Sequence, residues 1–187
     1  MLTSKYKIGL LLILLLLGVI ALSYNKQYKL QLDSHANTKP NEVDQLVGQK
    51  RPDFSLPDRL GIPYNISEWD GKVIILNFWA TWCRPCRKEM PMFYQFQQDY
   101  QEKGLQFIGI AIDDKAAVDV FFKQTGINVN YPILIGDDEA IPIAKNYGNE
   151  FGVLPYSVII DRQGLIQYLH YGEINREQIE EKIAALL

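Results

Sequence analysis

The sequence predicts an α/β domain with a mostly parallel central sheet flanked by helices, from about residue 48 to residue 187. Short apolar runs at 73–78 and 105–112, the first of them rich in β-branched residues, indicate buried strands. Helical patterns follow both runs, and strands that alternate with helices indicate crossovers between parallel strands. A chain of 187 residues has room for one such domain beside an N-terminal segment.

Local patterns define the remaining elements. Gly126 suits the end of a helix, Pro142 suits a first helical turn, and Asn175 with Gln178 forms a capping-box pattern. A turn pattern at 161–164 predicts that the strands on either side pair as a hairpin. Strands are expected at 51–57, 64–67, 73–78, 105–112, 131–135, 156–160 and 165–171. Helices are expected at 116–124, at 141–147 and after 175, in addition to one that follows the strand at 73–78.

The most informative stretch is VIILNFWATWCRPCRKEMP at residues 73–91. Its apolar strand ends shortly before Cys83, and a charged and then aromatic helical pattern follows Cys86. Pro85 suits the first turn of that helix, where the missing N–H costs nothing. Cys83 and Cys86 are therefore expected at a strand-to-helix junction, facing the same side of the helix.

This placement gives Cys83 a reason to be reactive. Unpaired N–H groups and the positive end of the helix dipole stabilise a thiolate at a helix N-terminus. A lower thiol pKa also makes Cys83 a good leaving group, so Cys86 resolves mixed disulfides quickly. The spacing therefore predicts disulfide exchange, with Cys83 as the exposed nucleophile and Cys86 as the resolving thiol.

Three other uses of a cysteine pair have less support. Cys83 and Cys86 are the only cysteines, and His35 and His170 are the only histidines, so a four-ligand zinc site is disfavoured. Covalent haem attachment needs a histidine after the second cysteine, where Arg87 stands. An inert structural disulfide is disfavoured by the three-residue spacing at a helix start. We expect no metal and no cofactor.

The N-terminal 24 residues predict a membrane segment. Ile8–Leu22 is an uninterrupted run of Leu, Ile, Val, Gly and Ala that follows Lys5 and Lys7. With two further residues it is about 25 Å of helix, the low end of a bilayer span. We expect an uncleaved single-pass anchor; a cleaved signal peptide is the alternative, since Ala21–Ser23 resembles a cleavage site. Both interpretations export the domain to a compartment where disulfides form, outside the cytoplasm.

Residues 25–47 are polar and lack periodicity, which predicts a flexible tether that keeps the domain close to the membrane. Charge is unevenly distributed. The residues before Asp33 carry a net charge of +4, whereas the rest of the chain, with the remaining basic residues and all 22 acidic ones, carries −7. An acidic domain disfavours nucleic acid as a partner.

The motif Asn-Phe-Trp-Ala-Thr-Trp-Cys-x-Pro-Cys at 77–86, followed by Lys-Glu-Met-Pro, resembles the active site of the thioredoxin superfamily. More narrowly, it resembles the membrane-anchored extracytoplasmic branch of TlpA/ResA/CcmG (DsbE)-like proteins, over residues 48–187. The resemblance implies a thioredoxin-like fold, with a helix-containing insertion at Asp113–Pro132. It also implies a periplasmic-side reductase of client protein disulfides, in some members the cysteines of apocytochrome c, supplied by a membrane-bound electron donor.

The resemblance also implies roles for individual residues. Pro155 occupies the place of a cis-proline that lies against the cysteine pair, and Leu154 would offer backbone groups to an extended client. Glu89 matches an active-site glutamate that relays a proton to or from the second cysteine. Trp82 and Pro85 would shape the rim, with Trp82 contacting the client. An ordinary strand-entry proline, a solvated Glu89 and surface packing of Trp82 are the plainer alternatives.

Two positions affect the redox balance. Asn77 stands where cytoplasmic thioredoxin has a buried aspartate, which makes Glu89 the natural substitute as proton acceptor. Arg84 favours an oxidising protein, because a cation beside Cys83 stabilises the thiolate and therefore the reduced form.

Two other functions remain open. The segment Arg51–Pro57 also resembles the start of peroxiredoxins, but their peroxidatic cysteine has Thr three residues earlier, where this chain has Ala80. A non-enzymatic module that holds client peptides beside Leu154 and Pro155 is the third interpretation.

Overall fold

The computed structural model describes residues 20, 23–24, 26–27 and 45–187, and residues 45–187 belong to one compact unit. The predicted membrane segment, apart from a few positions, and most of the predicted tether lie outside the described residues. Among the residues that are described, every helix is too short or too polar to cross a bilayer.

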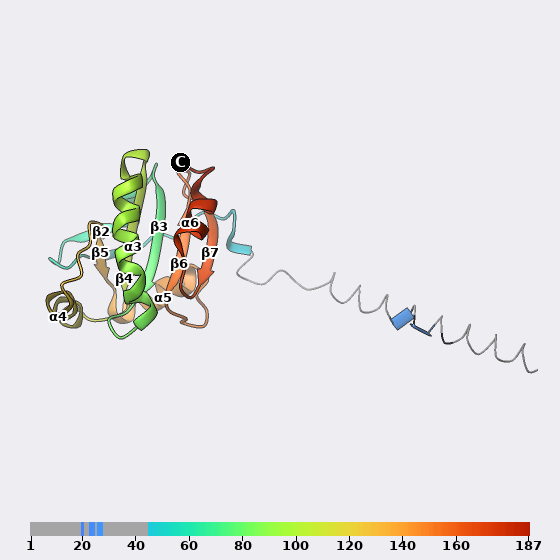
Figure 1. Ribbon diagram of the computed structural model, residues 1–187, viewed down its shortest axis with the longest axis horizontal. Coiled ribbons are helices and arrows are strands. Elements are labelled where there is room, and N and C mark those ends of the chain that lie inside the picture. Colours follow the sequence, from blue (N-terminus) through green and yellow to red (C-terminus); the bar gives the residue numbers. More distant parts are fainter. Residues whose placement is uncertain (1–19, 21–22, 25, 28–44) are drawn as a thin grey trace, which may run out of the picture. The chain divides into compact units, whose positions relative to one another are not determined.

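A five-stranded sheet forms the centre of the unit, in the order β5-β4-β3-β6-β7 (Figure 1). Parallel pairing joins β3 to β4 and β4 to β5, whereas β6 pairs antiparallel with both β3 and β7. All strands except β6 therefore run in one direction, which confirms the mixed, mostly parallel sheet. The strands are β3 (Val73–Trp79), β4 (Leu105–Ala111), β5 (Ile133–Ile135), β6 (Tyr156–Ile160) and β7 (Ile166–Tyr171).

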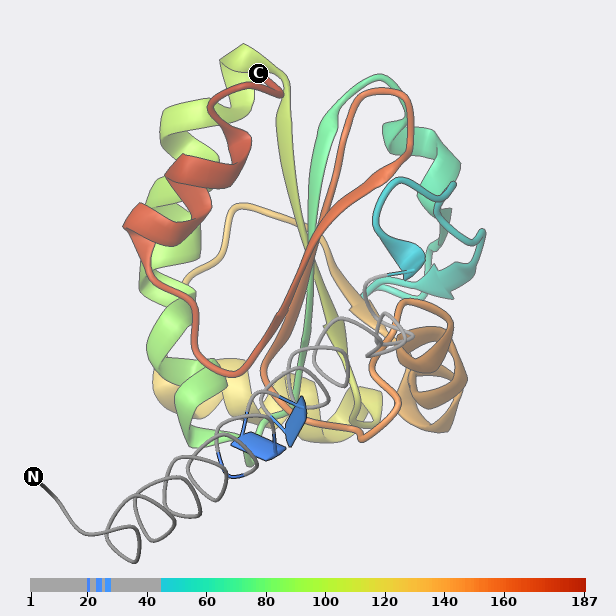
Figure 2. The same cartoon turned by 90° about the vertical axis from the view of Figure 1, so that its right-hand side faces the viewer.

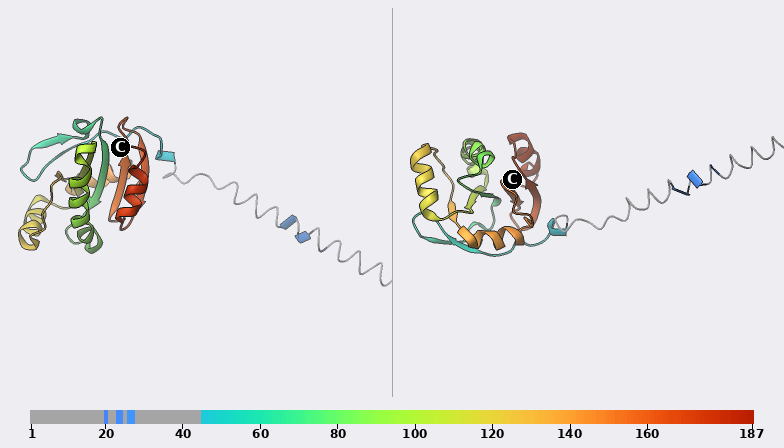
Figure 3. Two further views of the ribbon diagram at one scale, coloured as in Figure 1. Left: turned by 45° about the horizontal axis from the view of Figure 1, so that its top comes forward. Right: turned by 90° about the horizontal axis from the view of Figure 1, so that it is seen from below.

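Helices cover both faces of this sheet. One face carries α3 (Arg84–Tyr100), α4 (Lys115–Thr125) and α6 (Arg176–Ile183), which share one apolar core with the sheet. The other face carries α5 (Asp137–Asn146) and the N-terminal elements. Figures 2 and 3 show the two layers on either side of the strands. The N-terminal elements are β1 (Ser55–Pro57), β2 (Pro63–Asn65), which pairs antiparallel with β1, and the 3-10 helix η1 (Ile66–Trp69).

Strand β3 explains why its sequence is apolar without interruption. Successive side chains of a strand point to opposite faces, and both faces of this sheet are covered. Ile75 and Trp79 belong to the core beneath α3, while Leu76 and Phe78 belong to the core beneath α5. Asn77 shares the parity of Ile75 and Trp79, which places it on the α3 face.

Two predicted helix ends are confirmed by their local geometry. Gly126 ends α4 in the left-handed conformation, with φ 64°, and its N–H donates to the Phe122 carbonyl. Asn175 caps α6 by accepting a hydrogen bond from the Gln178 N–H at 2.9 Å, and the Gln178 side chain accepts one from the Asn175 N–H.

The region around α5 differs from the prediction. The helix begins at Asp137, four residues before the expected Ile141, so Pro142 lies inside it rather than in its first turn. Three acidic residues occupy the first turn, where they stabilise the positive end of the helix dipole. That signal outweighed the proline. Strand β5 is also shorter than expected, because it begins at Ile133 rather than at Tyr131.

Candidate active site at the start of helix α3

The cysteine pair lies where strand β3 passes into helix α3. Cys83 is the N-cap residue of the helix, and its Sγ accepts a hydrogen bond from the Cys86 N–H at 3.3 Å. Pro85 occupies the first turn. The two cysteines are joined by a disulfide, with their Cα atoms 5.3 Å apart. The predicted strand-to-helix junction is confirmed, and the pair is in its oxidised form.

In this oxidised form neither cysteine is exposed. Cys83 retains 5% of its accessible surface and Cys86 retains 1%, and both pack in the apolar core beneath α3. The expectation of an exposed Cys83 is therefore wrong for the disulfide state, because the bonded sulfurs lie against apolar side chains. Cys83 is still the more accessible of the two.

Trp82, which precedes Cys83 in the chain, and Leu154 line the same hollow. Trp82 is 69% exposed, and the hollow is mostly apolar, with a volume of about 150 Å³. The Leu154–Pro155 peptide bond is cis, as the resemblance implied. The buried Asn149 holds the loop before Leu154 through two hydrogen bonds to Val153. Its side-chain amide donates to the Val153 carbonyl at 2.9 Å, and its amide oxygen accepts from the Val153 N–H at 3.0 Å.

Glu89 lies one helical turn beyond Cys86 and is buried, with 2% of its surface exposed. Its Oε1 accepts a hydrogen bond from the Ile174 N–H at 2.5 Å, and its Oε2 has no partner among the described residues. Burial raises the pKa of this carboxyl to about 8, while the Ile174 N–H acts in the opposite direction. The group therefore holds a proton at neutral pH. A solvated Glu89 is excluded.

Asn77 forms a neutral hydrogen-bonded pair with Ser157. Its Nδ2 donates to Ser157 Oγ at 3.1 Å, across the β3–β6 pairing. Both side chains are buried, on the face of the sheet that packs beneath α3. Glu89 is the buried carboxyl one helical turn from Cys86.

Three residues of the site were not found from the sequence. Ile174 contacts Glu89 through its backbone N–H from 85 residues away, and a backbone contact leaves no signal in the side-chain pattern. Asn149 resembles an ordinary loop residue. In the sequence, Arg87 matters only because it stands where haem attachment needs a histidine, whereas in the structure it lines a hollow beside Trp82.

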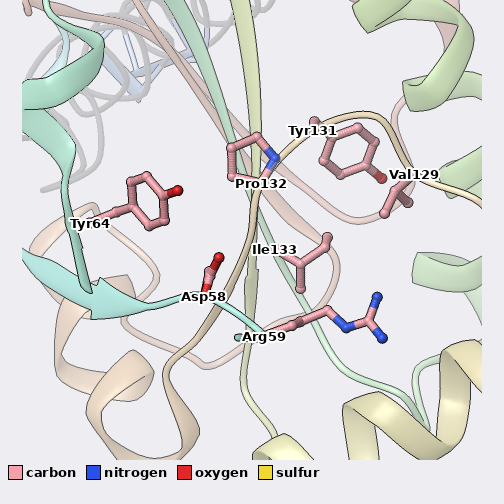
Figure 4. Close-up of a pocket in the computed structure, with 7 residues that line it drawn as sticks. All are labelled: Asp58, Arg59, Tyr64, Val129, Tyr131, Pro132 and Ile133. Atoms are coloured by element: carbon pink, nitrogen blue, oxygen red, sulfur yellow. The ribbon is translucent and has the colours of Figure 1, made fainter. Parts of the chain in front are cut away.

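A separate hollow of about 260 Å³ lies between the β1–β2 loop and residues 129–133 (Figure 4). Arg59, Tyr64 and Tyr131 are among the side chains around it, and none of the predicted site residues lines it. Within the part of the chain that the structure describes, no three His, Cys, Asp or Glu side chains are arranged to hold a metal ion.

Together, the sheet order, the disulfide at the start of α3 and the cis-proline loop define a thioredoxin-like redox protein. The Redoxin family model matches residues 46–187. The chain belongs to the Redoxin family.

Individual relatives narrow the class. Thiol-disulfide oxidoreductase ResA of Bacillus thuringiensis subsp. konkukian is 36% identical over 145 residues, covering 77% of this chain and 79% of the relative. ResA of Geobacillus kaustophilus is 31% identical over 141 residues, covering 75% and 78%. A solved thiol:disulfide interchange protein from Chlorobium tepidum TLS is 29% identical, with a TM-score of 0.63 and coverage of 73% of this chain and 94% of its own. The protein is a ResA-like thiol–disulfide oxidoreductase whose redox pair is Cys83 and Cys86.

Proposed function

We propose that this protein is a membrane-anchored extracytoplasmic enzyme that reduces disulfides in client proteins. In its reduced form, the Cys83 thiolate attacks a client disulfide and releases one client thiolate, forming a mixed disulfide. The Cys86 thiolate then attacks Cys83 Sγ and releases the second client thiolate. Two electrons pass to the client, and the Cys83–Cys86 disulfide remains for a membrane-bound dithiol donor to reduce.

The position of Cys83 at the helix N-cap is the observation that carries the disulfide exchange in this proposal; the direction of exchange rests on burial of the pair. Its Sγ faces the Cys86 N–H and the positive end of a 17-residue helix. These interactions stabilise a thiolate at Cys83 more than at Cys86, which lies deeper. Cys83 is therefore suited to attack and to leave, and Cys86 to resolve.

Glu89 suits the proton transfer that accompanies resolution. Cys86 must lose its proton to attack, and in the buried core only a nearby group can accept it. Glu89 lies one turn away, and its raised pKa of about 8 matches that of a thiol. We propose that the minority of Glu89 that is ionised near neutral pH accepts the Cys86 proton as Cys86 attacks, and that Glu89 is protonated in the disulfide form.

Burial favours the reducing direction. The disulfide is neutral, whereas the reduced pair places thiols or a thiolate in an apolar core beside Glu89. An environment that disfavours the thiolate lowers the reduction potential and makes the dithiol a stronger reductant. Arg84 and the helix N-terminus oppose this effect.

The client is proposed to bind across Trp82 and the Leu154–Pro155 loop. Leu154 supplies backbone groups to an extended segment, and the apolar hollow beside it takes a neighbouring side chain. Export and anchoring rest on the Ile8–Leu22 segment. A role in reducing apocytochrome c rests on the resemblance of residues 73–91 alone.

Trapping in cells tests this function. The full chain carrying Cys86→Ala should accumulate mixed disulfides with exported proteins through Cys83, and Cys83→Ser should accumulate none. Peroxide consumption with thiol regeneration is measured in parallel, and rapid turnover would favour the peroxidase instead. If the doubly substituted Cys83→Ser/Cys86→Ser chain restored cellular function, the protein would be a binding module rather than an oxidoreductase of client proteins.

A further inference from the structure

A second hollow lies beside Trp82, on the side of the insertion helix α4. It measures about 340 Å³ and is lined by the active-site loop, the first turns of α3 and one face of α4. Trp82 also lines the hollow next to Leu154, so the two hollows share this side chain as a wall. Its lining includes Thr81, Trp82, Arg87, Ala117 and Val120.

Arg87 is the charged residue that lines this hollow, and no acidic residue lines it. Its Nε is buried without a hydrogen-bond partner among the described residues. None of the ion pairs within residues 45–187 includes Arg87. The terminal Nη groups are not among the buried atoms, so they are the donors that a ligand in the hollow can reach. The guanidinium is thus available for an anionic partner.

The surroundings reinforce this positive charge. The first turn of α3 holds no acidic residue, so the helix dipole is not offset there. Asp113 and Asp114 precede α4, and backbone N–H groups donate to both carboxylates: that of Thr81 to Asp113 at 2.5 Å and that of Ala117 to Asp114 at 2.8 Å. Elsewhere the domain is acidic, with 14 basic and 19 acidic residues in 45–187.

We propose that this hollow binds a carboxylate side chain of the client. That side chain belongs to a residue near the client's reacting cysteine and lies against α4 of this protein. Arg87 would bind the carboxylate with two parallel hydrogen bonds, and Ala117 and Val120 would contact the methylene groups of a glutamate. The protein therefore prefers client segments with an acidic residue near the cysteine. This inference rests on the proposed function and names its substrate class.

Peptide kinetics test the preference. The reduced full chain is mixed with a series of disulfide-containing peptides whose residues around the cysteine are otherwise neutral. Each peptide carries one glutamate at a different position before or after the cysteine, and a control peptide carries glutamine at that same position. At the preferred position, kcat/KM should be about five-fold higher for glutamate, and high salt should reduce the ratio. Equal rates for every pair would overturn the inference.

Three variants separate binding by Arg87 from an effect on the thiol. Arg87→Gln should abolish the glutamate preference. Arg84→Gln removes an exposed cation from the same helical turn and should change the rates of both peptides alike, leaving the preference intact. Val120→Glu, at a half-exposed position, should reverse the preference by placing a carboxylate at the hollow. If Arg87→Gln slowed both peptides equally, Arg87 would act only on Cys83, and the inference would fail.

Binding without chemistry keeps the two proposals distinct. The chain carrying Cys83→Ser/Cys86→Ser is titrated with the reduced glutamate and glutamine peptides by calorimetry. The glutamate preference should persist, and its absence would refute the hollow as a carboxylate site. A binding preference without any disulfide exchange by the unmodified chain would retain this site and reject the proposed function. Disulfide exchange with every peptide at equal rates would retain the proposed function and reject the carboxylate site.

Discussion

The buried carboxyl of Glu89 makes a quantitative prediction about stability. Glu89→Gln keeps the shape of the side chain and an oxygen that accepts from the Ile174 N–H, but it removes the ionisable group. In the folded protein the pKa of Glu89 is raised from 4.5 to about 8, mainly by burial. The folded state therefore holds this proton more tightly than the unfolded chain does, so raising the pH destabilises it.

The pH window follows from the two pKa values. Below 4.5 both states are protonated and the carboxyl has no effect on the pH dependence. Between 4.5 and about 8 the unfolded chain has lost the proton, and each pH unit lowers the stability contributed at this site by about 1.4 kcal/mol. The whole change is at most about 5 kcal/mol, a large share of the total stability of a small domain.

Urea unfolding of the oxidised protein from pH 5 to pH 8.5 measures this effect. The free energy of unfolding of the unsubstituted chain should fall relative to that of Glu89→Gln by several kcal/mol across the range. Glu177→Gln, at an exposed carboxyl of α6, is the matched control and should stay within about 0.5 kcal/mol of the unsubstituted chain. Parallel curves for Glu89→Gln and the unsubstituted chain would refute the raised pKa.

Three further predictions concern the rim and the core. Trp82→Ala should lower kcat/KM for peptide disulfides about ten-fold while leaving exchange with dithiothreitol within about two-fold, since the role we propose for this exposed indole is client contact; equal losses would indicate a damaged redox pair. A double-mutant cycle of Asn77→Ala and Ser157→Ala should give a coupling energy of about 1 kcal/mol in urea unfolding, and zero coupling would contradict their hydrogen bond. Phe93→Ala should cost about 3–5 kcal/mol, because its ring stacks on Phe107 at 4.2 Å in the core; a cost below 1 kcal/mol would show that the core closes around the gap.

The sequence predicted best where local chemistry decides the structure. The strand-to-helix junction at the cysteines, the helix end at Gly126 and the capping box at Asn175 were all expected and observed. Each depends on residues within one or two helical turns. The helix around Pro142 was placed wrongly because two local signals competed, and the acidic first turn outweighed the proline.

The environment of the site could be predicted only in part. The position of Glu89 followed from helical spacing, but its burial depends on the loop before α6, which packs over it from far along the chain. Cys83 was expected to be exposed because its reactivity requires access, whereas the disulfide packs it into the core. Arg87 gave no signal in the sequence, because the hollow that it lines exists only once α4 is in place.

The most direct test is a single-turnover transfer of one disulfide. The reduced full chain is mixed with one equivalent of a disulfide-bonded protein substrate, and mass spectrometry after acid quenching follows both partners. We predict that the substrate disulfide is lost at the rate at which the Cys83–Cys86 disulfide forms, in equal amounts, with a transient adduct through Cys83. If the substrate stayed oxidised while the chain remained a dithiol, the protein would not reduce protein disulfides.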